Sequence, residues 1–383
     1  GYALDFVKAL APWLSDIKAK GIKVVANAGG VNPRGCSDAL AKAAAQAGID
    51  LSIGVVLGDD LLPRADEIRK KVPMVYYHVW DNFPPPQFNA DFYNSNDVVA
   101  CISKVTHEIV KAVAPEVESH YVPHAVNEAY FHPAKTDEEK QATENLRSRI
   151  TQGNTKKKIF FWNNRNARRK QSGTLIWWFK EWLDKVGHDK AMLLMHTDPR
   201  DPHGQDLPHL INHLGLDSGQ VLLSTNKVPS EQLAAMYRAA DYTINISDAE
   251  GFGLATLESL SCGTPIIVNM TGGLQEQVTD GKNFFGFAIE PVSKTVIGSL
   301  QVPYIYEDRI SQRDFEKALT RAIKNPAKKY KQMSSQGRRH VLKSYNFETF
   351  EKSWVELMDK VIQEHGSWET RTNYHRWHLM EVA

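Results

Sequence analysis

Short apolar runs alternate with amphipathic stretches along most of the chain. In the second half, runs rich in β-branched and aromatic residues predict strands at KIFFW, AMLLMH, QVLLST, YTINI and PIIV. Between them lie stretches with apolar residues at helical spacing, such as TLIWWFKEWLDKV. Strands that alternate with helices indicate parallel sheets of the doubly wound type, so the pattern predicts an α/β fold.

The first half shows the same alternation. Helices are predicted over Leu4–Lys20, from a start at Ser37, near Ala65–Lys71, and from a start at Ser103. Strands are predicted at IKVVANA, IDLSIGVV, VPMVYYH, DVVACI and SHYVPHAV. This order also favours a parallel sheet.

The chain is long enough for two domains. It has 383 residues, of which 42% are hydrophobic, so each half can build its own core. The charged stretch 136–155 has the mixed signs of a solvated helix and is the predicted linker between domains at 1–135 and 156–346. An amphipathic helix from Phe347 to about Glu364 opens the final segment, 347–383.

Charge and composition exclude several classes of protein. A net charge of +1 gives no electrostatic reason to expect nucleic acid as a partner. No apolar run reaches the roughly 20 residues of a transmembrane helix, and no signal-peptide pattern opens the chain. The cysteines Cys36, Cys101 and Cys262 lack metal-ligand spacing. We therefore expect a reduced, cytoplasmic protein.

The segment 247–265, which reads SDAEGFGLATLESLSCGTP, contains the strongest chemical signal. Glu250 closes the run that begins with the strand YTINI, Gly251 and Gly253 allow a tight turn, and a helix is predicted from Leu254. A turn of this kind presents free backbone amides and the positive end of the helix dipole. Both features suit a diphosphate.

Two carboxylates stand eight residues apart in this segment. Glu250 lies at the turn, where it can meet a sugar, and Glu258 lies about one turn into the helix, where it can accept hydrogen bonds from ribose hydroxyls. The spacing alone is also typical of an ordinary strand-turn-helix with surface acids.

The whole arrangement, with its GFGL core and the following CGTP, resembles the donor-site signature of family 4 retaining glycosyltransferases of the GT-B fold. The resemblance implies two Rossmann-like domains that face each other across a cleft, with the last helix crossing back to the first domain. It implies retaining, metal-independent transfer from a UDP- or GDP-linked sugar to an unidentified acceptor, which is a glycan, a lipid or a small molecule. No cofactor is implied. The donor-binding residues would include Glu258, Gly251, Phe252, Gly253 and Leu254.

A basic loop, NNRNARRKQSG, follows the predicted strand KIFFW. Doubly wound domains bind ligands at the carboxyl ends of their strands, although a basic surface loop is the alternative interpretation. The resemblance assigns the donor diphosphate to Arg165 and Lys170, with Arg169 as a competitor for the arginine role. Two cations would neutralise the charge on the departing nucleoside diphosphate, which would make a metal unnecessary.

Three further positions follow from the resemblance. His78 ends the strand VPMVYYH; a lone histidine is more often structural, but here the resemblance places it facing the donor sugar. Gly29 and Gly30 follow IKVVANA, where they either reverse the chain or approach the donor phosphates. Val228, in the segment NKV after QVLLST, corresponds to backbone that reads the nucleotide base.

Residues 1 to about 70 resemble a different group. GYALDFVKALAPWLSDIKAKGIKVVANAGGVNPRGCSDAL and GVVLGDDLLPRADEIR are similar to the acyclic-terpene-utilisation family, whereas residues 73 to about 364 resemble the glycosyltransferases. The combination suggests a fusion or chimera and leaves the acceptor side undefined. Two alternatives stay open: a nucleotide-sugar epimerase of GT-B-like architecture, and a donor-binding protein without turnover.

Overall fold

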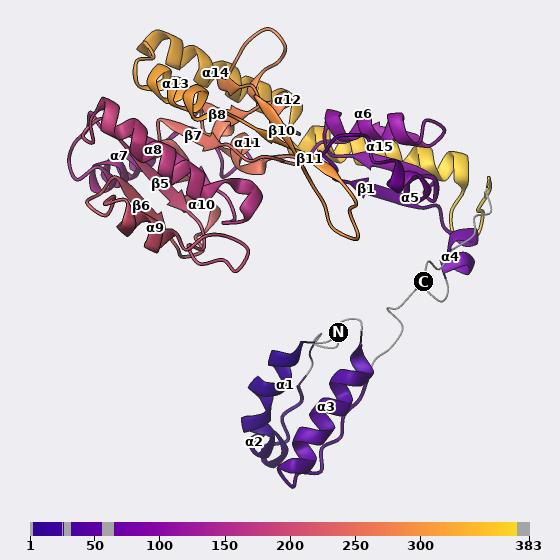
Figure 1. The fold of residues 1–383 in the computed structure, drawn as a ribbon. Coiled ribbons are helices and arrows are strands. Elements are labelled where there is room, and N and C mark those ends of the chain that lie inside the picture. Colours follow the sequence, from indigo (N-terminus) through magenta and orange to yellow (C-terminus); the bar gives the residue numbers. More distant parts are fainter. Residues whose placement is uncertain (1–2, 25, 27–31, 56–64, 374–383) are drawn as a thin grey trace. The chain divides into compact units, whose positions relative to one another are not determined.

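The computed structural model describes residues 3–24, 26, 32–55 and 65–373 (Figure 1). The chain divides into two compact units. One runs from the N-terminus to Val72 and includes a segment that begins at Ser367, and the other runs from Pro73 to Gly366. The predicted domain boundaries at residues 135 and 156 stay predictions.

The regular elements among the described residues of the N-terminal unit are all helices. These are α1 (Leu4–Leu10), η1 (Ala11–Trp13), α2 (Leu14–Ala19), α3 (Pro33–Gln46) and α4 (Ala65–Lys71). The single helix predicted over 4–20 is broken by a 3₁₀ turn that contains Pro12, since proline has no N–H for an α-helical hydrogen bond.

The predicted start of the next helix at Ser37 is also wrong. Helix α3 begins at Pro33, because the side chain of Asn32 accepts a hydrogen bond from the N–H of Gly35 at 2.9 Å. An asparagine cap followed by proline at the first helical position is a strong start signal.

The two strands predicted in this unit do not form in its described residues. Residues 22–24, 26 and 49–55 have no strand assignment. Ile49, Leu51 and Ile53 instead pack against the helices, on a cluster that contains Leu14, Ile17, Leu40 and Ala44. Their alternating pattern is used for packing on helices rather than for a hydrogen-bonded ladder.

The second unit opens with a small parallel sheet in the order β1 (Val75–His78), β2 (Val98–Cys101) and β3 (Glu118–Tyr121). The connections contain η3 (Gln87–Asn89), α5 (Ala90–Asn94) and α6 (Lys104–Val113). Ser103 caps α6 by accepting the N–H of Thr106 at 3.1 Å, as its place before the helix predicted.

Both faces of this sheet are covered. Val99 and Cys101 pack with a cluster that includes Ile109 of α6. Their neighbours on β2 point the other way, as alternation along a strand requires. Val98 and Ala100 pack against Leu357 and Val361 of α15 (Phe347–His365). The last helix therefore crosses back to the first sheet, as the resemblance implied.

The larger sheet has six parallel strands in the order β6-β5-β4-β7-β8-β9. They are β4 (Lys158–Asn163), β5 (Ala191–His196), β6 (Val221–Ser224), β7 (Tyr242–Asn245), β8 (Ile266–Asn269) and β9 (Gly286–Ile289). This is the strand order of a Rossmann fold, in which the direction of winding reverses between β4 and β7.

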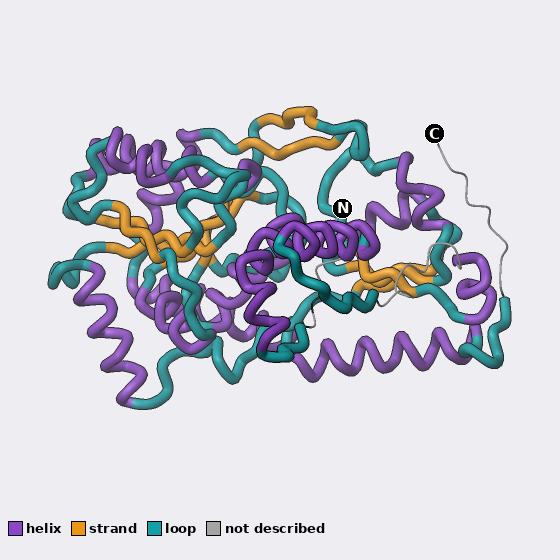
Figure 2. Tube along the Cα trace, turned by 90° about the horizontal axis from the view of Figure 1, so that it is seen from below, coloured by secondary structure: helices purple, strands orange, loops and turns teal. Residues whose placement is uncertain are grey.

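Helices cover both faces of the larger sheet (Figure 2). One core includes residues of α8 (Ser172–Val186), α9 (Leu207–His213) and α13 (Gln312–Ile323), and receives Phe160 and Trp162 of β4. The other core receives Ile159 and Phe161. It includes residues of α10 (Ser230–Ala239), α11 (Leu254–Ser261), α12 (Leu274–Val278) and α14 (Ala327–Ser344).

Two further elements complete the second unit. Helix α7 (Asp137–Ile150) occupies the predicted linker, where its Arg147 donates hydrogen bonds to the carbonyl of Ala239 and to Asp241. After β9, a two-stranded antiparallel hairpin is formed by β10 (Ser293–Ile297) and β11 (Ile305–Arg309). The sequence pattern did not predict this hairpin.

Candidate functional site

The loops after β4 and β7 lie together at the winding reversal of the larger sheet. The basic loop after β4 includes η4 (Arg168–Lys170), and the loop after β7 contains the segment that begins at Ser247. The N–H of Asp248 donates to the carbonyl of Arg169 at 2.8 Å, and the Arg169 guanidinium donates to the carbonyl of Ala249. The carboxyl ends of adjacent strands thus bring the two strongest sequence signals together.

Glu250 is the centre of this arrangement and is buried. Its Oε2 pairs with Nζ of Lys170 and accepts from Asn245 Nδ2 at 3.0 Å, and its Oε1 lies 3.9 Å from Arg169 Nη1. Burial acts to raise the pKa of Glu250, but Lys170 and Arg169 outweigh it and hold that pKa below its ordinary value. The carboxylate is therefore ionised at neutral pH.

Glu258 lies on α11 and is mostly buried. Its Oε2 accepts a hydrogen bond from the hydroxyl of Tyr237 at 2.7 Å, and that same hydroxyl accepts from Asn163 Nδ2 at 2.8 Å. Burial raises the pKa of Glu258, against the opposing effect of the Tyr237 hydrogen bond. Glu258 is therefore not the surface acid that an ordinary strand-turn-helix would carry at this position.

The turn between the two acids depends on its glycines. Gly253 caps α11 with a φ of +95°, a conformation that side-chain-bearing residues rarely adopt. Phe252 is buried, with its ring 5.7 Å from that of His124 and 5.9 Å from that of Tyr345. Its side chain is thus part of the core. Leu254, the first residue of α11, is exposed.

The basic loop divides between two sites. Lys170 is buried beside Glu250, and Arg169 also faces that carboxylate. Arg165 instead makes two hydrogen bonds to the carboxylate of Asp201, from Nε at 2.6 Å and from Nη2 at 3.1 Å. The structure brings Arg169 and Lys170 to the turn, whereas Arg165 contacts the loop after β5.

His78 ends β1 and is buried. Its Nε2 lies 2.9 Å from the hydroxyl of Tyr93, which also accepts a weak hydrogen bond from Asn89 Nδ2 at 3.3 Å. Within the described part of the chain, Nδ1 of His78 has no hydrogen-bond partner. Burial lowers the pKa of His78 to about 4, so the imidazole is neutral at neutral pH.

The orphaned nitrogen defines what His78 can do. If the hydroxyl of Tyr93 donates to Nε2, the single ring proton of the neutral imidazole is on Nδ1. A buried N–H without a partner costs about 1–3 kcal/mol, which a ligand oxygen can recover.

The remaining sequence predictions are less constrained. Val228 lies partly buried in the loop between β6 and α10, at the same edge of the sheet as the turn. Gly29 and Gly30 lie outside the described residues, so their proposed approach to the donor phosphates stays a prediction.

Sequence reasoning missed a set of charged residues on β11. Glu307 is 1% exposed and accepts two hydrogen bonds from Arg168, at 2.8 and 2.5 Å, and a third from Arg309 at 2.9 Å. Arg309 also pairs with Asp248 at 2.8 Å. The signal in the sequence was the run of three charged residues in YEDR, which does not predict a partner as distant along the chain as Arg168.

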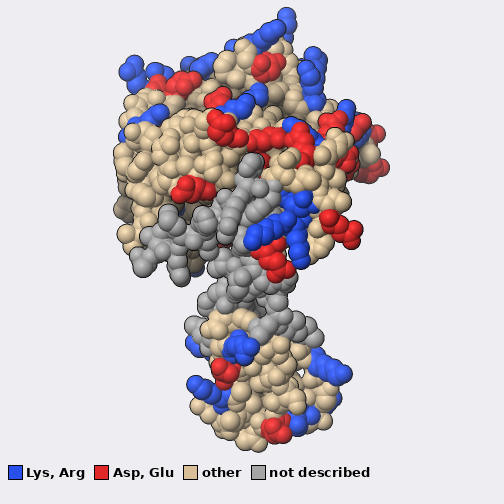
Figure 3. Space-filling model, turned by 90° about the vertical axis from the view of Figure 1, so that its right-hand side faces the viewer, with Lys and Arg blue, Asp and Glu red and all other residues tan. Residues whose placement is uncertain are grey.

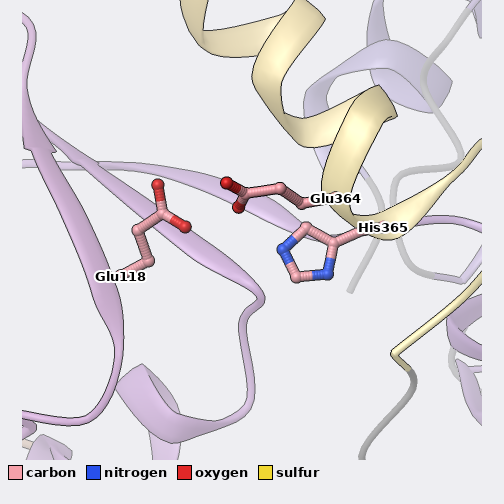
Figure 4. A group of neighbouring side chains, drawn as sticks. All are labelled: Glu118, Glu364 and His365. Atoms are coloured by element: carbon pink, nitrogen blue, oxygen red, sulfur yellow. The ribbon is translucent and has the colours of Figure 1, made fainter.

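One group of side chains has the composition of a metal site but already contains its own cation. Glu118 on β3 faces Glu364 and His365 at the end of α15 (Figure 4), and one ligand atom from each lies within 4.8 Å of the others. Nζ of Lys360 pairs with Glu118 and lies 3.8 Å from Glu364. The ammonium group supplies the positive charge, so the group is a structural contact between α15 and β3.

Charged side chains of both signs lie on the molecular surface. On the face drawn in Figure 3, basic and acidic side chains are interspersed, in keeping with the net charge of +1. Among the helices that the structure describes, none combines the length and the apolar composition needed to cross a bilayer.

Two family models match the chain. Residues 1–84 match the acyclic terpene utilisation family protein AtuA, and residues 143–340, about half of the chain, match the glycosyl transferases group 1. Both resemblances expected from the sequence are therefore confirmed.

Curated relatives align with only a small part of the chain. The D-inositol 3-phosphate glycosyltransferase of Paenarthrobacter aurescens is 36% identical over 77 residues, which are 20% of this chain and 18% of that protein. The enzyme of the same name from Streptosporangium roseum is 51% identical over 53 residues, 14% of this chain and 12% of that protein. The matches thus span less than a fifth of these relatives.

Solved structures with the same fold cover much more of the chain. A glycosyltransferase from Rickettsia africae gives a TM-score of 0.63 at 16% identity, over 92% of this chain and 88% of that one. HepE from Anabaena, in complex with UDP and glucose, gives 0.60 at 15% identity, over 94% and 96%. These likenesses confirm the expected GT-B fold with its Rossmann-like domains. By its fold and by the family model that covers about half of it, the chain belongs to the glycosyl transferases group 1 family.

Proposed function

We propose that this chain is a retaining glycosyltransferase that moves a sugar from a nucleoside-diphosphate sugar to an acceptor hydroxyl without a metal ion. The observation that carries the proposal is the Lys170–Glu250–Arg169 cluster at the winding reversal of the larger sheet. Ligands of doubly wound sheets bind at this edge, and the turn also offers the N-terminus of α11.

Each residue in the cluster has a role in this scheme. Arg169 and Lys170 bind the diphosphate and neutralise the charge that develops as it departs, while Glu250 holds the sugar. Arg165 is paired with Asp201 and does not contact Glu250, so Arg169 is the better candidate for the arginine that binds the diphosphate. The departing phosphate oxygen takes the proton of the acceptor hydroxyl as the new bond forms on the same face of the sugar.

The nucleoside part of the donor lies further along the same edge. In this scheme Glu258 accepts hydrogen bonds from ribose hydroxyls, and the backbone near Val228 contacts the base. UDP is the favoured nucleotide, because HepE has the same fold and its complexes contain UDP with glucose and UDP-glucose. His78 offers its unpartnered Nδ1 to an oxygen of the sugar.

Glu258 gives the most direct test of donor binding. Nucleotide sugars are first screened by thermal shift, since a ligand that fills the site stabilises the fold by mass action. Glu258→Ala is then expected to weaken binding of the best ligand by about 1.5–3 kcal/mol, the value of hydrogen bonds to a charged group. Calorimetry measures this loss, with the exposed Glu231→Ala as the control. Unchanged affinity in Glu258→Ala would contradict the ribose assignment.

Chelation tests the proposed leaving-group chemistry. Because Arg169 and Lys170 supply the positive charge, release of UDP from UDP-glucose is expected to continue unchanged in excess EDTA. Loss of turnover that Mg²⁺ or Mn²⁺ restores would show that a metal shares this role.

The same assay separates the alternative functions. With donor alone, a nucleotide-sugar epimerase interconverts the sugar, whereas a transferase releases the nucleotide slowly as water takes the place of the acceptor. A donor-binding protein shows the thermal shift and neither reaction.

A further inference from the structure

The loop after β1 lies directly against the turn that carries Glu250. Cγ1 of Val79 is only 2.4 Å from the point where a Cβ on Gly251 would lie, so the two segments approach as closely as a glycine allows. Cβ of Asp81 is 3.0 Å from the point where a Cβ on Gly272 would lie. The N–H of the next residue, Gly273, donates a hydrogen bond to the carbonyl of Glu250 at 2.9 Å.

The far end of this loop is fixed to the hairpin. Asn82 Nδ2 donates to the carbonyl of Tyr306 at 3.0 Å, and the N–H of Tyr306 donates to the carbonyl of Phe83 at 2.6 Å. Asp81 is therefore held from both sides, between Val79 and Asn82, on a segment that comes from the smaller sheet.

The electrostatic surroundings of Asp81 are those of the candidate donor site. Burial and, to a smaller extent, the charge of Glu250 raise the pKa of Asp81, while Arg169, a backbone hydrogen bond and Lys170 oppose them, and the net result is a pKa of about 6. Because the pKa of Asp81 is raised, its ionisation at neutral pH destabilises the folded, ligand-free protein. A ligand that donates hydrogen bonds would compensate for this cost.

We propose that Asp81 binds the acceptor, by accepting a hydrogen bond from a hydroxyl group of a neutral polyol next to the hydroxyl that attacks the sugar. The inference rests on the proposed function, since it uses the donor position that the Lys170–Glu250–Arg169 cluster defines. Those three residues belong to the larger sheet, whereas Asp81 approaches from the smaller one. Asp81 therefore approaches the donor position from the sheet opposite to the one that holds the cluster, and we place the acceptor on that side.

The chemical step balances without a proton on Asp81. The acceptor oxygen bonds to C1 of the sugar as the bond from C1 to the β-phosphate oxygen breaks, and the attacking hydroxyl gives its proton to that phosphate oxygen. Asp81 holds a second O–H throughout and orients the nucleophile. Its charge disfavours acceptors with an anionic group at this point, which selects sugars or cyclitols over their phosphate esters there.

Asp81→Asn tests the proposal, because it keeps the shape of the side chain and removes its charge. The probes are UDP, UDP-glucose, and UDP-glucose with water or glycerol as the acceptor. We expect the affinities for UDP and UDP-glucose to stay within about twofold of wild type. Turnover with glycerol should fall about 10²-fold, the effect of a misplaced nucleophile, whereas turnover with water, which has no second hydroxyl for Asp81 to hold, should stay near wild type. The matched control is Asp91→Asn, an exposed aspartate of α5.

Each other outcome would overturn the assignment. Normal turnover with glycerol, or an equal fall with water, would show that Asp81 does not hold a second hydroxyl of the acceptor. Weaker binding of UDP-glucose with normal binding of UDP would assign Asp81 to the donor sugar. A lower melting temperature with normal turnover in the folded fraction would make the role structural. If the wild-type protein binds no nucleotide sugar, the proposed function itself fails, which is seen before any variant is compared.

Discussion

Glu258 shows how a single residue can be costly for the fold and useful for binding. Its carboxylate is mostly buried, and the hydroxyl of Tyr237 is its hydrogen-bond partner at 2.7 Å. Burial raises the pKa of Glu258, so the folded protein holds this proton more tightly than the unfolded chain does. Ionisation at neutral pH therefore favours unfolding, and the stability that the protonated form contributes is lost as the pH rises.

Glu258→Gln should consequently stabilise the ligand-free protein and weaken its binding of the donor. The amide oxygen can still accept the hydrogen bond from Tyr237, and no charge is buried. We expect a melting temperature about 2 °C above wild type at pH 7.5, a difference that disappears as the pH falls to the ordinary glutamate pKa of 4.5. Scanning calorimetry at both pH values measures this, with the exposed Glu231→Gln as control. A variant that melts below wild type at pH 7.5 would contradict the sign.

At the scale of elements, the hairpin β10–β11 fastens the two sides of the candidate site together. Its Asp308 N–H donates to the carbonyl of Asp248 at 2.9 Å, and its Tyr306 bonds the loop that carries Asp81. Glu307 lies between two guanidinium groups and is the buried anchor of the strand. The hairpin thus positions residues of both sheets.

Glu307→Ala is expected to loosen this anchor. It leaves Arg168 and Arg309 without their shared carboxylate, although both guanidinium groups remain partly exposed to water. We expect a loss of about 2 kcal/mol in the free energy of unfolding, below the full cost of an unpaired buried charge. Urea denaturation measures it against Glu290→Ala, an exposed acid after β9. An unchanged midpoint would mean that the backbone alone holds the hairpin.

At the scale of the whole second unit, contacts between its two sheets determine how the candidate site is assembled. The buried carboxylate of Glu276 on α12 accepts the N–H of Lys104 at the start of α6 at 3.0 Å and the hydroxyl of Tyr121 at 3.0 Å. An acid at a helix N-terminus is favoured by the exposed amides and the dipole there. The smaller sheet, with His78 at its edge, is held against the larger one by such contacts.

His78→Ala tests whether the smaller sheet takes part in turnover. Arg169, Lys170 and Glu258, which are proposed to bind the nucleotide, lie in a loop and a helix that flank the larger sheet, so binding of free UDP should change little. Turnover should fall about 10²–10³-fold, because the contact from Nδ1 acts mainly in the transition state. Melting temperature and single-turnover rate are measured on the same preparation, with the partly exposed His188→Ala as control. A destabilised variant with normal turnover would make His78 a structural histidine.

The sequence by itself determined the elements whose signals are local. Short apolar runs located five of the six strands of the larger sheet, all but β9. The glycine turn and Ser103 predicted where α11 and α6 begin. The donor turn and basic loop were found because a strand followed by glycines or cations is a short-range pattern. Prediction failed where a local signal was misjudged, as at Pro12 and Asn32, or where a strand pattern found no partner, as at 49–55.

Only the tertiary structure decided which charged groups meet. Lys170 precedes Glu250 by 80 residues, and the pairing exists because β4 and β7 are neighbours in the sheet. Contacts between distant parts of the chain likewise determine that Arg169 rather than Arg165 lies beside Glu250. They also determine that Glu258 meets Tyr237 and that Asp81 approaches Gly272. Periodicity records which face of an element is buried, but it does not record which distant side chain covers that face, and the chemistry of this site depends on those partners.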